Sequence, residues 1–328
     1  MRGRAHNFSH CLSFAMQGPN VHQVTGRWRL GLALALVTAL CWGILPIALK
    51  LALEGMDAYT ITWYRFAVAT VILGGILALT RRLPSLRTLG RRGWLLIAVA
   101  LFGLVANYIL YLIALDHASP TVNQTVIQLS PICLLLGGLI VFKERFARRQ
   151  WIGFAILIPG LLLFFNDRLD ELTQLDRGLG LGVLLLVFAS VVWAGYALAQ
   201  KQLLKTLNSQ QILWILYVGA VLIIFPMSHP GELRALEPLP LWMLIFSCAN
   251  TLIAYGAFAE ALEHWEVSRV SAVLALAPLF TIVGMWTVES LVPGLLAPEK
   301  LSGLSIGGAL MVVAGSAMTA LGGGPEPG

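Results

Sequence analysis

The residues best suited to bind a ligand are two glutamines in an otherwise apolar run, residues 121–142. Thr121, Gln124, Gln128 and Pro131 follow at spacings of three, four and three residues, which places them on one face of a helix. Polar groups turned to lipid would lack hydrogen-bond partners, so this face must meet protein or a wet cavity. Hydrogen bonding between helices is one explanation. We favour cavity lining, because amides offer donors and acceptors to a neutral or zwitterionic ligand.

Other amides and aromatic residues lie in neighbouring apolar runs. Asn107 and Tyr111 are four residues apart and share a helix face. A buried asparagine often only joins helices, and tryptophan often marks the membrane interface. Trp42 and Trp193, however, lie in the middle of their runs. The predicted binding residues are Trp42, Asn107, Tyr111, Gln124, Gln128, Trp193, Tyr196, Asn250 and Tyr255.

Four ionisable residues are candidates for coupling or gating. Glu260 lies less than one turn from the end of the run 241–262, and acids inside membranes commonly mark proton paths. Its shallow depth favours a plainer interpretation, in which it is an interfacial side chain paired with Arg269. Lys50 and Arg65 lie near the outer face, close to two acidic residues. They either form a gate pair or, as we favour, extend to the headgroups.

The composition indicates which elements must position these residues. The chain has 328 residues, of which 58% are hydrophobic and 12% charged, with a mean hydropathy of +0.81. Soluble domains carry about 25% charged residues, so much of this surface must face lipid. The runs are too long, and alternate too little, for barrel strands. The net charge of +6 is spread between the runs, which indicates topology signals and no nucleic-acid partner.

The apolar runs predict an all-α integral membrane protein with ten transmembrane helices, each near the length of about 20 residues that a bilayer requires. The expected spans are Leu30–Leu53, Thr60–Leu79, Trp94–Leu115, Thr121–Phe142, Trp151–Asn166, Gly178–Ala199, Ile212–Met227, Leu241–Leu262, Val267–Val288 and Leu301–Leu321.

Basic and acidic connections alternate between these spans. Five arginines fall within 81–92, and further basic residues fall within 143–149 and 201–205. Basic loops face the cytoplasm, so both termini are expected there. Residues 1–28 lack the apolar core of a signal peptide and predict a disordered cytoplasmic tail, with Met16 as an alternative start. Residues 322–328 predict a flexible tail.

An internal repeat divides the spans into two sets of five. Residues 108–137 and 255–284, offset by 147, are identical at eight of thirty positions. Pro131 and Pro278 are equivalent in this alignment and are candidate hinges. An odd number of spans per copy inverts the second copy, as in many carriers. We therefore expect five-helix repeats at 29–166 and 178–321, joined by an external linker, 167–177.

Signatures of catalysis and metal binding are missing from the sequence. It contains no HExxH, GxSxG or Walker motif and no intramembrane GxGD. His117 and His264 each follow an acid at a span end, but the inverted topology separates them across the membrane. We expect no enzymatic activity, no cofactor and no metal site.

Several short motifs, taken in order, resemble the drug/metabolite transporter superfamily and its EamA-type exporters. They include Trp42-Gly43, Lys50 and Arg65, and the stretch from Ser130-Pro131 to Glu144. The second half repeats the pattern with Ala277-Pro278, Glu289, Gly308 and Gly315. The resemblance covers nearly all of 29–321. It implies a ten-helix fold of two inverted halves, with a cavity lined mainly by the first, third, fourth, sixth, eighth and ninth helices.

We therefore expect a secondary transporter in a bacterial inner membrane that exports a small amphipathic metabolite, an amino acid or a drug-like compound, by alternating access. A sugar-phosphate or nucleotide-sugar antiporter is one alternative, but no basic cluster occurs in the cavity helices. A membrane-embedded enzyme or sensor is the other. The expected partners are a small-molecule substrate and the lipid bilayer; proton coupling and a homodimer stay open.

Overall fold

The computed structural model describes residues 25–85, 89–118, 120–141, 147–164, 166, 177–296 and 302–321. Every regular element among them is helical. The α-helices are α2 (Trp28–Ala52), α3 (Ala58–Leu79), α4 (Arg91–His117), α5 (Pro120–Val126), α6 (Leu129–Val141), α7 (Arg148–Phe164), α9 (Arg177–Leu203), α10 (Ser209–Ile224), α11 (Pro238–His264), α12 (Val267–Leu274), α13 (Ala277–Leu291) and α14 (Gly303–Leu321). Two 3-10 turns, η2 (Phe225–Met227) and η3 (Pro230–Ala235), connect α10 to α11.

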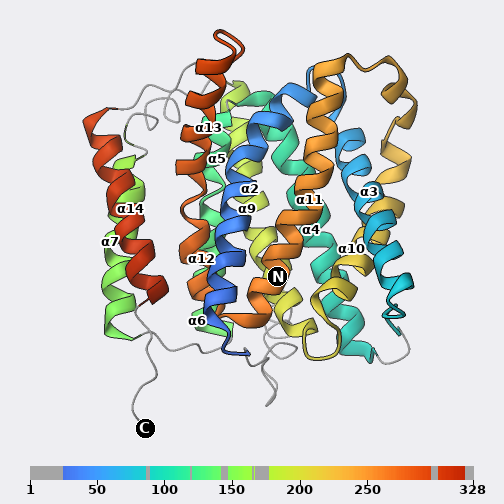
Figure 1. The fold of residues 1–328 in the computed structure, drawn as a ribbon, viewed down its shortest axis with the longest axis horizontal. Helices are drawn as coiled ribbons and strands as arrows, with labels where there is room; N and C mark the ends of the chain where they lie inside the picture. Colours follow the sequence, from blue (N-terminus) through green and yellow to red (C-terminus); the bar gives the residue numbers. More distant parts are fainter. Residues whose placement is uncertain are drawn as a thin grey trace, which may run out of the picture.

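The chain is an integral membrane protein. The helices stand side by side in one bundle (Figure 1), and within the described residues seven helical segments are long and apolar enough to cross a membrane. Large apolar side chains are exposed on many of the helices, such as Leu79, Ile140 and Leu222. Such a surface would be an aggregation hazard in water, but it suits contact with hydrocarbon.

Each expected span overlaps a helix, and local capping determines several of the boundaries. Asp57 accepts hydrogen bonds from the backbone N–H groups of Tyr59 and Thr60 and so caps α3. Asn208 and Gln211 form a reciprocal capping box at the start of α10. Such side chains satisfy the N–H groups that the first helical turn leaves without partners. These helices therefore begin two to three residues earlier than hydropathy predicts.

Two of the expected spans are each broken into two helices. The run 121–142 divides between α5 and α6 at residues 127–128, and the run 267–288 divides between α12 and α13 at residues 275–276. A proline lies in the first turn after each break, Pro131 in α6 and Pro278 in α13. Proline has no N–H to continue a helix, but it is tolerated in a first turn. The two candidate hinge prolines therefore each lie just after a break in an expected span.

The expected tails and linker lie mostly outside the described residues. Residues 25–28 are the exception in the N-terminal tail, and they are ordered. The Thr25 backbone N–H donates to the carbonyl of Glu263, and the Thr25 side chain is 2.8 Å from Nδ1 of His264. Trp28 already begins α2. The last residues of the expected disordered tail are therefore held against the end of α11.

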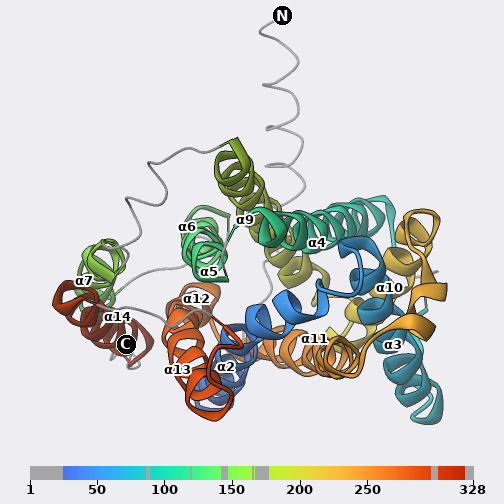
Figure 2. The same ribbon diagram turned by 90° about the horizontal axis from the view of Figure 1, so that it is seen from above.

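The helices pack in long antiparallel and crossed pairs. In Figure 2, α4 and α9 lie along one side of the bundle, α2 and α11 along the other, and α7 with α14 at one end. Glycines permit close approaches between helices. A Cβ on Gly103 of α4 would lie 2.5 Å from the carbonyl oxygen of Val192 in α9, and one on Gly43 of α2 would lie 2.6 Å from that of Ala277. Small residues allow such backbone contact in membranes.

The basic residues of two connections gather at the end of the bundle where α2 begins. Lys205 follows α9, and Arg92 lies in the first turn of α4. Burial, and then the positive charge of Arg92, lower the pKa of the Lys205 ammonium group. The two connections meet near the start of α10, where Nε2 of Gln211 donates to the carbonyl of Arg82 over 2.8 Å.

Candidate substrate cavity

A cavity of about 90 Å³ lies inside the bundle, between the N-terminal and C-terminal sets of helices. Its walls come from α2, α3, α4, α5, α9 and α11, from the first helix break, and from the ends of α6, α12 and α13 that adjoin the breaks. Most of the lining surface is apolar, with a minority of polar groups, as in many small-molecule sites. The predicted residues that line it are Trp42, Arg65, Asn107, Tyr111, Gln124, Gln128, Trp193 and Tyr255.

The two glutamines of the predicted polar stripe both reach the cavity. Gln128 lies in the two-residue break between α5 and α6 and is 3% exposed. Its Oε1 atom is buried without a hydrogen-bond partner. Gln124 is nearly as buried, and its Oε1 accepts a long hydrogen bond of 3.4 Å from the Tyr111 hydroxyl. Leaving a buried acceptor without a partner costs free energy. Oε1 of Gln128 can therefore accept a hydrogen bond from a ligand or from water.

The two predicted asparagines both join helices. Nδ2 of Asn107 donates to the carbonyl of Ala189 in α9 over 3.0 Å. Nδ2 of Asn250 donates to the carbonyl of Cys41 in α2 over 2.7 Å. Asn107 also lines the cavity, whereas Asn250 does not. Asn250 therefore fits the alternative interpretation, in which a buried asparagine only joins two helices.

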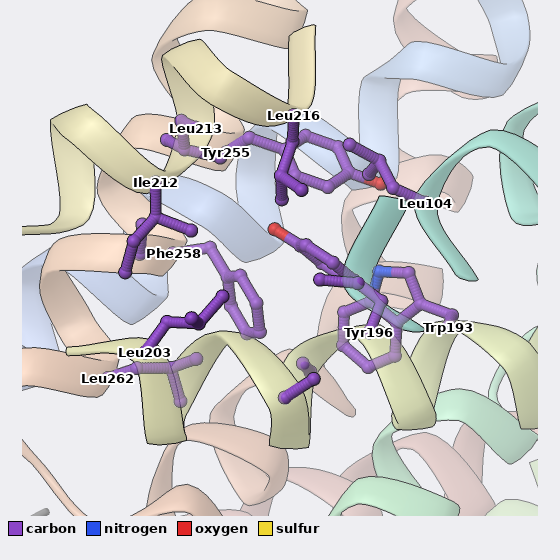
Figure 3. Close-up of a cluster of buried hydrophobic side chains, with 14 of the residues drawn as sticks. Leu104, Trp193, Tyr196, Leu203, Ile212, Leu213, Leu216, Tyr255, Phe258 and Leu262 are labelled. Atoms are coloured by element: carbon purple, nitrogen blue, oxygen red, sulfur yellow. The ribbon is translucent and has the colours of Figure 1, made fainter. Parts of the chain in front are cut away.

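The predicted aromatic residues lie together in the middle of the bundle. The Trp42 ring lies 5.4 Å from Trp193 and 5.2 Å from Tyr255, centroid to centroid, with an edge against a face. Tyr196 lies 6.4 Å from Trp193 and is fully buried behind it. Figure 3 shows Trp193, Tyr196, Tyr255 and Phe258 within one cluster of buried side chains. Trp42, Trp193 and Tyr255 thus face the cavity, and Tyr196 supports them.

Arg65 does not extend to the headgroups. Its side chain is 2% exposed and lines the cavity. Nε donates to Oγ1 of Thr251 over 2.8 Å, and the guanidinium lies 4.4 Å from the centre of the Tyr108 ring. Distance from the helix end suggested a shallow position, but Arg65 lies two turns into α3 on its inward face. This burial corrects the interpretation that the Arg65 side chain extends to the headgroups.

Lys50 lies apart from Arg65 and does not line the cavity. Its Nζ donates to the carbonyl of Leu115 at the end of α4 over 2.8 Å. This bond joins the ends of α2 and α4, and it uses a backbone group rather than an acid. Of the two nearby acids, Asp57 caps α3. Among the described residues, neither Lys50 nor Arg65 forms an ion pair with Glu54 or Asp57, so these residues form no gate pair.

Glu260 lies at the opposite end, outside the cavity. Its carboxylate accepts a hydrogen bond of 2.7 Å from the Ser209 hydroxyl and lies 3.8 Å from Nε2 of His264. Arg269 pairs with Glu266 at 2.8 Å. The expected pair between Glu260 and Arg269 is therefore replaced, because a nearer acid lies three residues before Arg269 on the same turn.

Some lining residues were not among the predicted binding residues. Ser130 is buried next to the α5–α6 break, and its hydroxyl has no hydrogen-bond partner. Tyr108 lies under the Arg65 guanidinium. Leu45 and Leu49 form an apolar wall on α2. The position of Ser130 directly before Pro131 could have identified it as a lining residue from the sequence. Two leucines in an apolar run give no such indication.

Comparison with known proteins identifies the fold and its relatives. The EamA-like transporter family matches the chain twice, at residues 29–166 and 180–321. An uncharacterized transporter of Haemophilus influenzae is 41% identical over 293 residues, covering 89% of this chain and 95% of the relative. The uncharacterized inner membrane transporter YhbE of Escherichia coli K12 is 42% identical over 294 residues, covering 89% and 92%.

More distant proteins extend the comparison. A probable amino-acid metabolite efflux pump of Escherichia coli K12 is 23% identical over 295 residues, covering 86% of this chain and 92% of the pump. A solved crystal structure aligns with a TM-score of 0.64 and 17% identity, covering 88% of this chain and 95% of that one. At this identity the crystal structure supports the fold alone.

Proposed function

This chain belongs to the EamA-like transporter family, within the drug/metabolite transporter superfamily, and we propose that it exports a small amphipathic metabolite by alternating access. The observation that carries the proposal is the cavity between the two sets of helices, which is lined by both aromatic rings and amides. The named relatives are transporters, which supports transport over enzymatic activity.

The packing supports two inverted repeats of five helices. The third helix of the first family match, α4, packs on the first helix of the second, α9. Reciprocally, α11 packs on α2. The fourth segments behave alike, since α6 packs on α9 and α13 on α2. Such exchange of partners is expected from a pseudo-twofold axis in the membrane plane.

The helix breaks support a site at the interface of the repeats. Gln128 and Ser130 come from the first break, and Leu274 and Ala277 flank the second. Carriers commonly bind substrate at interrupted helices near the bilayer midplane. Pro131 and Pro278 follow the breaks, and we propose that both breaks act as hinges when one repeat rocks against the other.

The lining supports an amphipathic cargo over a phosphorylated one. Among the described residues that line the cavity, Arg65 is the only cation, whereas a sugar phosphate or nucleotide sugar calls for several. Trp42 and Trp193 offer an apolar surface, and Gln124 and Gln128 offer hydrogen bonds. The direction of transport rests on the distant relative named an efflux pump. The inner-membrane location rests on the relative named an inner membrane transporter.

The test is counterflow of radiolabelled amino acids and related metabolites in proteoliposomes, with and without a pH gradient. We expect protein-dependent exchange of at least one amphipathic compound. The double variant Gln124→Leu, Gln128→Leu should lower the rate by about tenfold or more, because it removes the amides that orient the ligand. Gln210→Leu, which replaces an exposed glutamine in the first turn of α10, is the control. Full exchange by the double variant would contradict the proposed site.

A further inference from the structure

Arg65 is a buried charge that lacks an anionic partner. No carboxylate of the described residues lies within ion-pair distance of its guanidinium. Among the described residues, its polar contacts are one hydrogen bond, from Nε to Thr251, and the face of the Tyr108 ring. A guanidinium has five N–H donors, so most of its hydrogen-bonding capacity is unused by the protein.

Burying an unpaired cation costs free energy because the charge loses its hydration. This cost is high for a charge inside a membrane-spanning segment. The aromatic face below it recovers only part of that cost. Lysine or arginine within a membrane segment is therefore usually placed where it meets a ligand or a pathway. Arg65 fits this pattern, since it lines the cavity and lies two turns inside α3.

The charge and geometry select the ligand group. A carboxylate carries one negative charge and accepts two parallel hydrogen bonds from a guanidinium. One carboxylate would neutralise Arg65 completely, whereas a phosphate dianion would leave a buried excess negative charge. A cationic ligand without an acid would add a second unpaired positive charge to an apolar cavity.

We propose that Arg65 is the specificity-determining residue of the cavity and that it binds the carboxylate of the transported molecule. This rests on the proposed transport function and narrows its cargo to amphipathic carboxylates, either zwitterions or simple organic acids. The apolar part of the ligand lies against Trp42 and Trp193. Where the ligand has an ammonium or hydroxyl group, the unpartnered Oε1 of Gln128 accepts from it. Thr251 acts as a positioning residue that holds the guanidinium in place.

The experiment compares matched pairs that differ only in the carboxylate. The probes are phenylalanine against phenylalaninamide, and 3-phenylpropionate against 3-phenylpropionamide, each added as a competitor of counterflow in proteoliposomes. Wild-type protein is expected to prefer each acid over its amide by about tenfold or more, as for other sites built around a charged hydrogen bond.

Two variants locate this preference. Arg65→Gln should abolish the preference for the acid, and Arg65→Lys should retain part of it, because an ammonium keeps the charge but not the bidentate geometry. Arg234→Gln, which replaces an exposed arginine in η3, is the matched control and should behave as wild type. If Arg65→Gln does not fold, Thr251→Val takes its place and should weaken the preference without reversing it.

The outcomes separate this inference from the proposed function. Wild-type protein that carries an amphipathic compound but accepts acid and amide equally would overturn the role of Arg65 and leave transport intact. Undiminished acid preference in Arg65→Gln would do the same. A purely structural role predicts loss of thermal stability in Arg65→Gln with the preference unchanged. Failure of wild-type protein to exchange any compound would overturn the proposed function, and this inference with it.

Discussion

Single polar residues inside the bundle fall into two groups that the sequence does not separate. Asn107 and Asn250 each give a hydrogen bond to a carbonyl of a neighbouring helix. Gln128 and Ser130 each keep an atom without a partner at the cavity, whereas the unpartnered Oδ1 of Asn250 lies outside the cavity. The first kind of residue holds helices together, and the second is available to a ligand. The two groups should therefore respond differently to mutation.

Asn250→Ala should lower stability and leave substrate preference unchanged. The substitution removes the hydrogen bond to Cys41, and bonds between membrane helices contribute about 1 kcal/mol. Thermal unfolding of the purified protein in detergent, followed by circular dichroism, measures the effect. Gln210→Ala is the control. An unfolding temperature equal to that of wild type would show that the bond between α11 and α2 does not contribute to stability.

Glu260 is better placed to join helices than to carry protons through the cavity. It contacts Ser209 and His264 at the end of α11, and its side chain is about one third exposed. Glu260→Gln should therefore keep any stimulation of transport by a pH gradient. Glu263→Gln, a variant of the second carboxylate near Ser209, is the comparison. Selective loss of stimulation in Glu260→Gln would assign proton coupling to Glu260 after all.

At the scale of helices, glycines set how closely pairs approach. Gly103 lies where α4 crosses α9, and an added Cβ would meet the carbonyl of Val192. Gly75 lies in α3 with open space around the same position. Helix propensity favours alanine over glycine at both positions, so packing alone separates the two sites.

Gly103→Ala should destabilise the protein by about 1–3 kcal/mol, the usual cost of overpacking. Gly75→Ala should be neutral or stabilising by up to about 1 kcal/mol, because alanine loses less conformational entropy in a helix. The pair of unfolding temperatures in one detergent is the measurement. Equal destabilisation of both variants would mean that α4 and α9 do not approach as closely as described.

At the scale of the whole molecule, the halves enclose the cavity, and the basic connections after α3 and α9 lie at the same end. The carbonyl of Arg82, after α3, accepts a hydrogen bond from Nε2 of Gln211 in the first turn of α10, next to the connection that holds Lys205. Glu232 lies in η3, which follows α10 at the opposite end (Figure 1). The distribution of basic loops predicts that the first end faces the cytoplasm.

Labelling of single cysteines tests this orientation. In a variant whose four native cysteines are replaced, Glu232→Cys should react with a membrane-impermeant thiol reagent in intact cells. Arg82→Cys, at the other end after α3, should react only after the cells are permeabilised. Both side chains are exposed, so access from one face alone controls the result. The reverse pattern would invert the protein in the membrane.

Much of this architecture follows from local properties of the chain. Hydropathy located the helices because burying about 20 apolar residues in a bilayer depends on local composition. Spacing placed Gln124 and Gln128 on one face because helical geometry is regular. Both glutamines line the cavity. The role of each as a binding residue stays a prediction.

Tertiary structure decided what depends on neighbours distant in sequence. Arg65 was expected at the surface, yet Thr251 and Tyr108, from two other helices, hold it inside. Asn250 and Gln128 are similar amides in similar runs, and each keeps a buried amide oxygen without a partner. Only the packed bundle gives Nδ2 of Asn250 a carbonyl partner away from the cavity and places Gln128 at the cavity wall. Hydropathy sums one segment at a time, whereas burial and hydrogen bonding in a helical bundle are set by the facing helices.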